Sequence, residues 1–143
     1  MANTEKLYKA YLTRRTTFSA AHRLHSKDLT DDENRRIYGK CNHPNGHGHN
    51  YVVEVMLCGP VDPISGMVVN MTDLKDWIEV AVMKSMDHKN LDKDVEFFHN
   101  RPSTTENVAI FIWNSLRQIM KEPELLYEVK IYETEKNIVT FRG

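Results

Sequence analysis

The stretch 41–58, CNHPNGHGHNYVVEVMLC, holds a turn, a cluster of histidines and an alternating strand. From residue 47 onward apolar and polar side chains alternate, which predicts a half-buried strand over 47–58 with Glu54 on its open face. The buried face carries Tyr51, Val53, Val55 and Leu57. Pro44-Asn45-Gly46 comes directly before and predicts a tight turn, because proline fixes φ while asparagine and glycine tolerate positive φ. The strand therefore begins at a turn, with its histidines first.

His47 and His49 are two residues apart at the start of this strand, so both imidazoles project from the same face. Their Cα atoms would lie about 6.5–7 Å apart, a suitable separation for two ligands of one metal ion. A third ligand must come from elsewhere, and His22 continues the apolar face of an earlier strand. Three neutral imidazoles with one open position are typical of a catalytic zinc site. The spacing alone also permits Cys41 as the fourth ligand of a structural zinc, or His43 in place of His22.

Outside this stretch the pattern predicts further strands at 7–20, 126–133 and 137–142 and helices at 31–38, 73–85 and 104–120. The predicted helix starts are the capping boxes Thr30-x-x-Glu33 and Ser103-x-x-Glu106 and a cap at Thr72. This order, with hairpin-like connections, predicts an α+β fold, in which an antiparallel four-stranded sheet carries two helices on one face. With no repeat, linker or low-complexity segment, we expect a single domain over residues 1–143.

The composition excludes several classes of protein. With 41% hydrophobic and 27% charged residues the chain matches an ordinary globular domain, and its formal net charge of −1 provides no field for nucleic acid or anionic membrane. No apolar run approaches the roughly 18 residues of a membrane span. Cys41 and Cys58 form no disulfide framework. We expect a cytoplasmic protein with reduced thiols, no nucleic-acid partner and no membrane partner.

Five motifs, in this order along the chain, resemble the 6-pyruvoyl-tetrahydropterin synthase family. They are FSAAHRL at 18–24, GKCNHPNGHGHNY at 39–51, MDHKNLD at 86–92, STTEN at 103–107 and YET at 132–134. The resemblance implies the tunnelling fold (T-fold), in which the sheets of a trimer close into a barrel and two trimers form a homohexamer. It implies a phosphate-lyase that converts 7,8-dihydroneopterin triphosphate into 6-pyruvoyl-tetrahydropterin with release of triphosphate, in tetrahydrobiopterin biosynthesis.

The resemblance also implies a role for each matched residue. One zinc ion per subunit would be held by His22, His47 and His49. Proton transfer would involve the Cys41 thiol as base, His88 as its relay, Asp87 to orient His88, and Glu133 in a charge relay. The pterin would be anchored by Thr104, Thr105 and Glu106. Asp87 and His88 would reach the site from a neighbouring subunit, so that active sites form at subunit interfaces.

Other interpretations make different use of the same residues. Relatives that make 6-carboxy-tetrahydropterin have a shorter gap between the cysteine and His-Gly-His, whereas five residues separate Cys41 from His47 here, which favours the pyruvoyl branch. A non-catalytic binding module would need only the histidines and Glu106. Glu106 could also serve only the predicted capping box of its helix. For the triphosphate, the nearest basic candidates in sequence are Arg23, Lys40 and Lys89.

Overall fold

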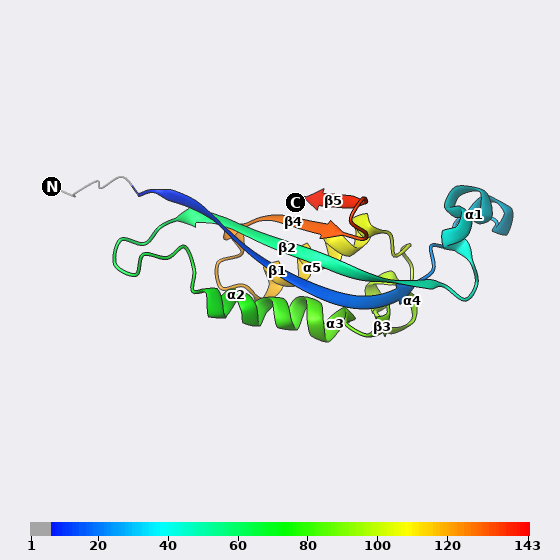
Figure 1. The fold of residues 1–143 in the computed structure, drawn as a ribbon, viewed down its shortest axis with the longest axis horizontal. Coiled ribbons are helices and arrows are strands. Elements are labelled where there is room, and N and C mark those ends of the chain that lie inside the picture. Colours follow the sequence, from blue (N-terminus) through cyan, green and yellow to red (C-terminus); the bar gives the residue numbers. More distant parts are fainter. Residues whose placement is uncertain (1–6) are drawn as a thin grey trace.

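The computed structural model describes residues 7–143, and its centre is a five-stranded sheet in the order β3-β1-β2-β4-β5 (Figure 1). Neighbouring strands pair antiparallel, except that β3 pairs parallel with β1 at Ala20 and Ala21. The strands are β1 (Lys9–His22), β2 (His47–Pro60), β3 (Lys89–Asn90), β4 (Leu126–Tyr132) and β5 (Ile138–Phe141). The predicted antiparallel four-stranded sheet is therefore confirmed, with β3 as a short additional edge.

The long pair β1 and β2 decides where the histidines lie. Their register runs from Lys9 opposite Pro60 to His22 opposite His47. Because side chains alternate between faces along a strand, this register gathers the apolar residues of both strands on one face. The largest of them, Phe18 and Tyr51, stack with ring centroids 4.8 Å apart. His22 continues this buried face and is itself fully buried, as its parity with Phe18 and Ala20 predicted.

Two helical segments pack on this apolar face (Figure 1). The first consists of α2 (Met71–Ile78), a π-helical turn (Glu79–Met83) and α3 (Lys84–Met86), and the second is α5 (Thr105–Ile119). Their buried side chains, together with those of β2 and β4, form the core: Leu74, Ile78, Val82, Met86, Val108, Ile112 and Leu116 from the helices. The predicted α+β architecture with two helices on one face is confirmed. Among the described residues no helix is both long and apolar enough to cross a membrane.

Shorter elements hold the ends of the long strands. They are α1 (Asp31–Tyr38), a 3₁₀ turn (Gly39–Asn42), α4 (Leu91–Asp94) and 3₁₀ turns at Glu96–Phe98 and Pro123–Leu125. The predicted helix 31–38 is confirmed together with its capping box, since Thr30 and Glu33 each accept a backbone N–H of the other. In Figure 1, α1 lies beyond one end of the sheet, and the loop after β2 lies beyond the other end.

Two predicted helix starts were wrong. The helix expected at 73–85 begins at Met71, and its N-cap is Asn70, whose side chain accepts the N–H of Thr72. The helix expected from 104 begins at Thr105, and its N-cap is Thr104, whose hydroxyl accepts the N–H of Asn107. The capping box Ser103-x-x-Glu106 does not form, because the Ser103 hydroxyl donates to Asp92 instead.

Candidate functional site

Three histidines meet at the end of the β1–β2 pair. His22 ends β1, His47 begins β2 directly opposite, and His49 pairs with Ala20. One nitrogen from each ring can be chosen such that all three lie within 4.8 Å of one another. The Nε2 atoms of His22 and His47 are 3.1 Å apart. This group could hold a metal ion.

The ring nitrogens of His22 have different partners, which determines the tautomer. Nδ1 lies 2.7 Å from the carbonyl oxygen of Ser103 and donates its hydrogen there, so Nε2 keeps a lone pair facing His47. Burial lowers the pKa of His22, although the Ser103 carbonyl opposes the shift, and His47 and His49 lower it further. The ring is therefore neutral near pH 7, as a metal ligand must be.

His49 presents a nitrogen that the protein leaves without a partner. Its Nε2 is buried and is the only buried side-chain nitrogen or oxygen within residues 7–143 that makes no hydrogen bond. Burial lowers the pKa of this ring too, against the attraction of Glu133, whose Oε1 is 3.9 Å from Nε2. Buried polar atoms normally have partners. An orphaned imidazole nitrogen facing two others fits a metal site better than it fits a packed core.

Glu133 joins this cluster from β4. It follows the last residue of the strand, and the register of β2 with β4 (Val52 opposite Tyr132) brings it level with Tyr51. Its Oε2 accepts the hydroxyl of Thr105 at 2.5 Å. The structure therefore brings Glu133 and Thr105 together with His49 at one end of the sheet.

A pocket opens beside this cluster. Its lining includes the three residues that the resemblance assigns to the pterin, and in full it consists of Leu24, Thr104, Thr105, Glu106, Glu133, Lys136, Asn137, Ile138 and Val139. Glu106 is exposed in the first turn of α5 and makes no side-chain hydrogen bond to the described part of the chain. Since Thr104 caps the helix, capping does not explain the Glu106 carboxylate.

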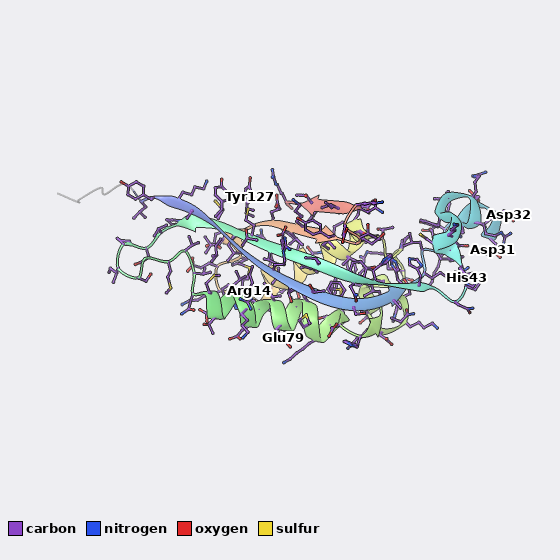
Figure 2. All side chains as sticks on the ribbon, in the orientation of Figure 1. Arg14, Asp31, Asp32, His43, Glu79 and Tyr127 are labelled. Carbon is purple, nitrogen blue, oxygen red and sulfur yellow. The ribbon has the colours of Figure 1, made fainter. Side chains whose placement is uncertain are left out.

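Cys41 and His43 lie in the segment between α1 and β2. Cys41 is half-buried in the 3₁₀ turn Gly39–Asn42, and its carbonyl accepts the N–H of Leu24, two residues after His22. Its thiol is not among the metal-ligating atoms that cluster with the three histidines. His43 is exposed at the α1 end of the molecule (Figure 2), where its Nδ1 accepts the N–H of Asn45. Of the two alternatives left open by spacing, neither Cys41 nor His43 joins the cluster.

Asp87 and His88 form a contact that adjacent residues rarely make. His88 has φ +61°, the only positive φ outside glycine among the described residues, and this turns its Nδ1 to 2.9 Å from Asp87 Oδ2. Ser19 of β1 fixes the turn, since it donates its N–H to Asp87 and accepts the N–H of His88. The Ser19 N–H, followed by His88, holds the pKa of Asp87 below its usual value. The His88 side chain is 82% exposed, and no hydrogen bond joins it to Cys41 within residues 7–143.

The basic candidates for the triphosphate are only partly brought together. Arg23 donates through Nε to the carbonyl of Asn42, and it lines a pocket that also contains Lys40 and Arg35. Lys89 lies apart, on β3 at the sheet edge. Arg23 also borders a second pocket, which contains Lys27, Lys93 and Arg101.

Three residues near the cluster were not anticipated. Tyr51 lies beneath it, with its hydroxyl 3.4 Å from His22 Nε2, and burial strongly raises its pKa. Ser103 accepts the Nδ1 hydrogen of His22 at its carbonyl, and its own hydroxyl donates to Asp92. Asp92 and Ser103 stand inside two of the matched motifs, which was a signal of their importance, but a carbonyl contact cannot be read from a side-chain pattern.

Comparison with known proteins gives one consistent result. The sequence model of the family described as 6-pyruvoyl tetrahydropterin synthase matches residues 11–143. The 6-pyruvoyl tetrahydrobiopterin synthase of Drosophila melanogaster is 62% identical over 134 residues, which cover 94% of this chain and 80% of that protein. The human protein of the same name is 53% identical over 135 residues, covering 94% and 92%. The solved 6-pyruvoyl tetrahydropterin synthase of Caenorhabditis elegans superposes with a TM-score of 0.95 at 50% identity, covering 98% of this chain and 99% of that one.

Proposed function

This chain belongs to the 6-pyruvoyl tetrahydropterin synthase family, a family of lyases, and we propose that it is a zinc enzyme acting on 7,8-dihydroneopterin triphosphate. The products would be 6-pyruvoyl-tetrahydropterin and triphosphate. The observation that carries the proposal is the three-histidine cluster with the unpartnered His49 nitrogen, next to a pocket that holds Glu106.

Zinc is the metal that this donor set favours. Three neutral imidazoles without a thiolate are typical of catalytic zinc centres, which keep one position open for substrate. Two nitrogens bound to one tetrahedral zinc at about 2.0–2.1 Å lie roughly 3.3 Å apart. The 3.1 Å between the Nε2 atoms of His22 and His47 is close to this value. We propose His22, His47 and His49 as the ligands, with one zinc per subunit.

A zinc ion in this position would act as a Lewis acid toward the side-chain hydroxyls of the substrate and so acidify the hydrogens on the neighbouring carbons. The protein must then remove a proton from carbon, and Cys41 is the proposed base. A free thiol is only a few per cent thiolate at pH 7, so Cys41 needs a partner that takes its proton. We propose His88 for that role, with Asp87 holding the imidazole through the 2.9 Å contact.

Glu133 and Glu106 are proposed to act at opposite ends of the substrate. The Glu133 carboxylate, held by Thr105 and next to His49, would relay charge near the reacting side chain. The Glu106 carboxylate would accept the N3–H and 2-amino hydrogens of the pterin as a bidentate pair. Its free carboxylate supports this role, and Thr104 and Thr105 line the same pocket.

The proposed enzyme is a homohexamer of two trimers in the cytosol, and its active sites lie between subunits. Within residues 7–143 of one chain, the His88 side chain is largely exposed and makes no hydrogen bond to Cys41, which supports a site completed by a second copy. The barrel of the trimer would be lined by the sheet face that the helices leave open.

The first experiment is a mass spectrum of the product formed when zinc-loaded protein meets 7,8-dihydroneopterin triphosphate. A tetrahydropterin that keeps all three side-chain carbons, with triphosphate released, supports the proposal. A product that has lost side-chain carbons would replace it with the carboxy-forming activity. Unchanged substrate that nevertheless binds would leave a non-catalytic pterin-binding module.

A further inference from the structure

One carboxylate, that of Asp92, ties together two segments that are far apart in the sequence. Its Oδ2 accepts the N–H of Arg23 at 2.7 Å, and its Oδ1 accepts the hydroxyl of Ser103 at 2.6 Å. Arg23 directly follows His22, and Ser103 stands just before α5. Asp92 therefore holds the backbone N–H directly after His22 and the side chain of Ser103.

Ser103 passes this constraint to the imidazole. Its carbonyl oxygen is 2.7 Å from His22 Nδ1, and its hydroxyl oxygen is 3.3 Å from the same atom. His22 and Ser103 are both fully buried, so no water can take the place of the carbonyl. Asp92 is itself held in place, because the Asn90 side chain accepts its N–H at 3.1 Å.

We propose that Asp92, acting through Ser103, is the positioning residue for His22. It holds the Ser103 carbonyl where it must accept the Nδ1 hydrogen, and the Nε2 lone pair is thereby left for the metal. A hydrogen bond from a hydroxyl to a carboxylate is short and roughly twice as strong as a neutral one, so it can keep a carbonyl in register. Partners of this kind fix the tautomer and ring orientation of a metal-ligating histidine. The inference rests on the proposed function in one respect, namely that the cluster holds a metal.

The competing explanation is that the network only fastens the start of α5 to the end of β1. In that case a substitution in the network would lower thermal stability but leave the molecules that stay folded with normal metal affinity. If Asp92 positions His22, the substitution would change the orientation and tautomer of the imidazole. The two explanations therefore differ in metal affinity and in the protonation pattern of the His22 ring, both of which can be measured without substrate.

The test compares Asp92→Asn, Ser103→Ala and the double variant with Asp94→Asn. Asp94 provides a matched control, because it lies two residues away and accepts the N–H of Asn90 at 2.8 Å, but it makes no direct hydrogen bond to Arg23, Ser103 or His22. Zn²⁺ affinity is measured by competition with a chromogenic chelator. The tautomer of His22 is read from ¹⁵N shifts of the imidazole in metal-free protein, and circular dichroism checks the fold of each variant.

We expect Asp92→Asn and Ser103→Ala each to weaken Zn²⁺ binding by about 10- to 100-fold, with little further loss in the double variant, because both break one chain of contacts. We also expect His22 to lose its uniform Nδ1–H tautomer, and Asp94→Asn to match the wild type. Wild-type affinity and tautomer in a folded Asp92→Asn protein would overturn the proposal. If the wild type binds zinc with the expected tautomer but does not turn over substrate, the proposed function fails while the role of Asp92 stands.

Discussion

Glu106 is a carboxylate at the start of α5 whose side chain makes no hydrogen bond within the described part of the chain. The helix is capped by Thr104, and the Glu106 side chain is exposed beside the pocket of the proposed pterin site. A residue that stabilises nothing can be replaced without loss of stability. Glu106 therefore provides a clean test at the scale of one residue.

We predict that Glu106→Gln abolishes pterin binding and leaves the melting temperature almost unchanged. The amide keeps the size of the side chain, but it presents one acceptor where the pterin needs two. Binding is measured by calorimetry or pterin fluorescence, and stability by thermal unfolding. The contrasting variant is Thr104→Ala, which removes the N-cap and should lower stability by about 1 kcal/mol. Normal pterin affinity in Glu106→Gln would remove Glu106 from the site.

A second residue-scale prediction concerns acid. Burial, followed by the neighbouring histidines, holds the pKa of His22 below its ordinary value of about 6.5, and burial also lowers that of His49. Below about pH 6.5 these two histidines bind protons in the unfolded chain but stay neutral in the folded chain. The free energy of unfolding therefore decreases as the pH drops from about 6.5 toward the pKa values of the folded state. Above about pH 6.5 these rings add no pH dependence.

The melting temperature of metal-free protein should therefore decrease on going from about pH 7 to pH 5, which can be followed by calorimetry in excess chelator. In His22→Gln and in His49→Gln part of this decrease should disappear, because each variant lacks one of the two rings whose pKa burial lowers. A melting temperature that is flat over this range in the wild type contradicts the burial argument.

Single-residue patterns predicted the geometry of the histidines well and that of Ser103 poorly. The period of two along a strand is a local property, so the shared face of His47 and His49, and the burial of His22 beside Phe18, follow from spacing. The role of Ser103 depends on its carbonyl meeting a ring 81 residues away. Such a contact is made by tertiary packing, and the local capping pattern therefore misled the prediction.

At the scale of elements, the turn from the 3₁₀ segment into β2 sets the position of the cluster. Gly46 has φ +71°, and a Cβ added there would lie 2.8 Å from the carbonyl oxygen of His22. Glycine is thus needed twice, once for its conformation and once for the close approach of two backbones. Gly66 has nearly the same conformation, φ +73°, with open space around it.

We predict that Gly46→Ala destabilises the protein more than Gly66→Ala does. In each variant the free energy of unfolding should fall by about 1–2 kcal/mol, because alanine is strained at positive φ. The loss should be larger in Gly46→Ala, because the backbone near His22 must also shift to make room for the new Cβ. Since the backbone in question belongs to His22, Gly46→Ala should also weaken Zn²⁺ binding, and Gly66→Ala should not. Chemical denaturation and chelator competition measure the two effects. Equal losses in both variants would mean that the close approach is of no consequence.

The helices and long strands were predictable as elements, while their irregularities were not. Periodicity located the two core helices, yet it missed the cap at Asn70 and the π-helical turn at Glu79–Met83. It also missed β3, because two residues cannot display a period. That small strand matters, since it follows the Asp87–His88 turn and pairs beside the Ser19 that holds it.

At the scale of the whole molecule, one face of the sheet has no helix on it, and this face carries two ion pairs among its side chains. Arg15 pairs with Glu54 at 2.9 Å, Tyr132 donates to the same carboxylate, and Arg142 pairs with Glu128. β3 covers only Ala20 and Ala21 of the outer edge of β1. The proposed trimer would join such edges between copies, and unpaired strand edges are suited to that.

The last prediction tests whether the site is shared between subunits. Cys41→Ala and His88→Ala should each be nearly inactive as purified proteins. If Cys41 of one copy works with Asp87 and His88 of another, co-expressed variants should recover activity, because some interfaces combine an intact Cys41 with an intact His88. In a ring whose neighbours meet head to tail, half of the copies keep Cys41 and half keep His88 when the two variants are present in equal amounts. About a quarter of the interfaces then join an intact Cys41 to an intact His88, so we expect about a quarter of the wild-type kcat per subunit. Mixing the purified variants without subunit exchange should recover nothing, which is the control. Co-expressed protein that forms mixed oligomers and stays inactive would place Cys41 and His88 on the same chain, and the relay between them would then need a rearrangement of the exposed His88 turn.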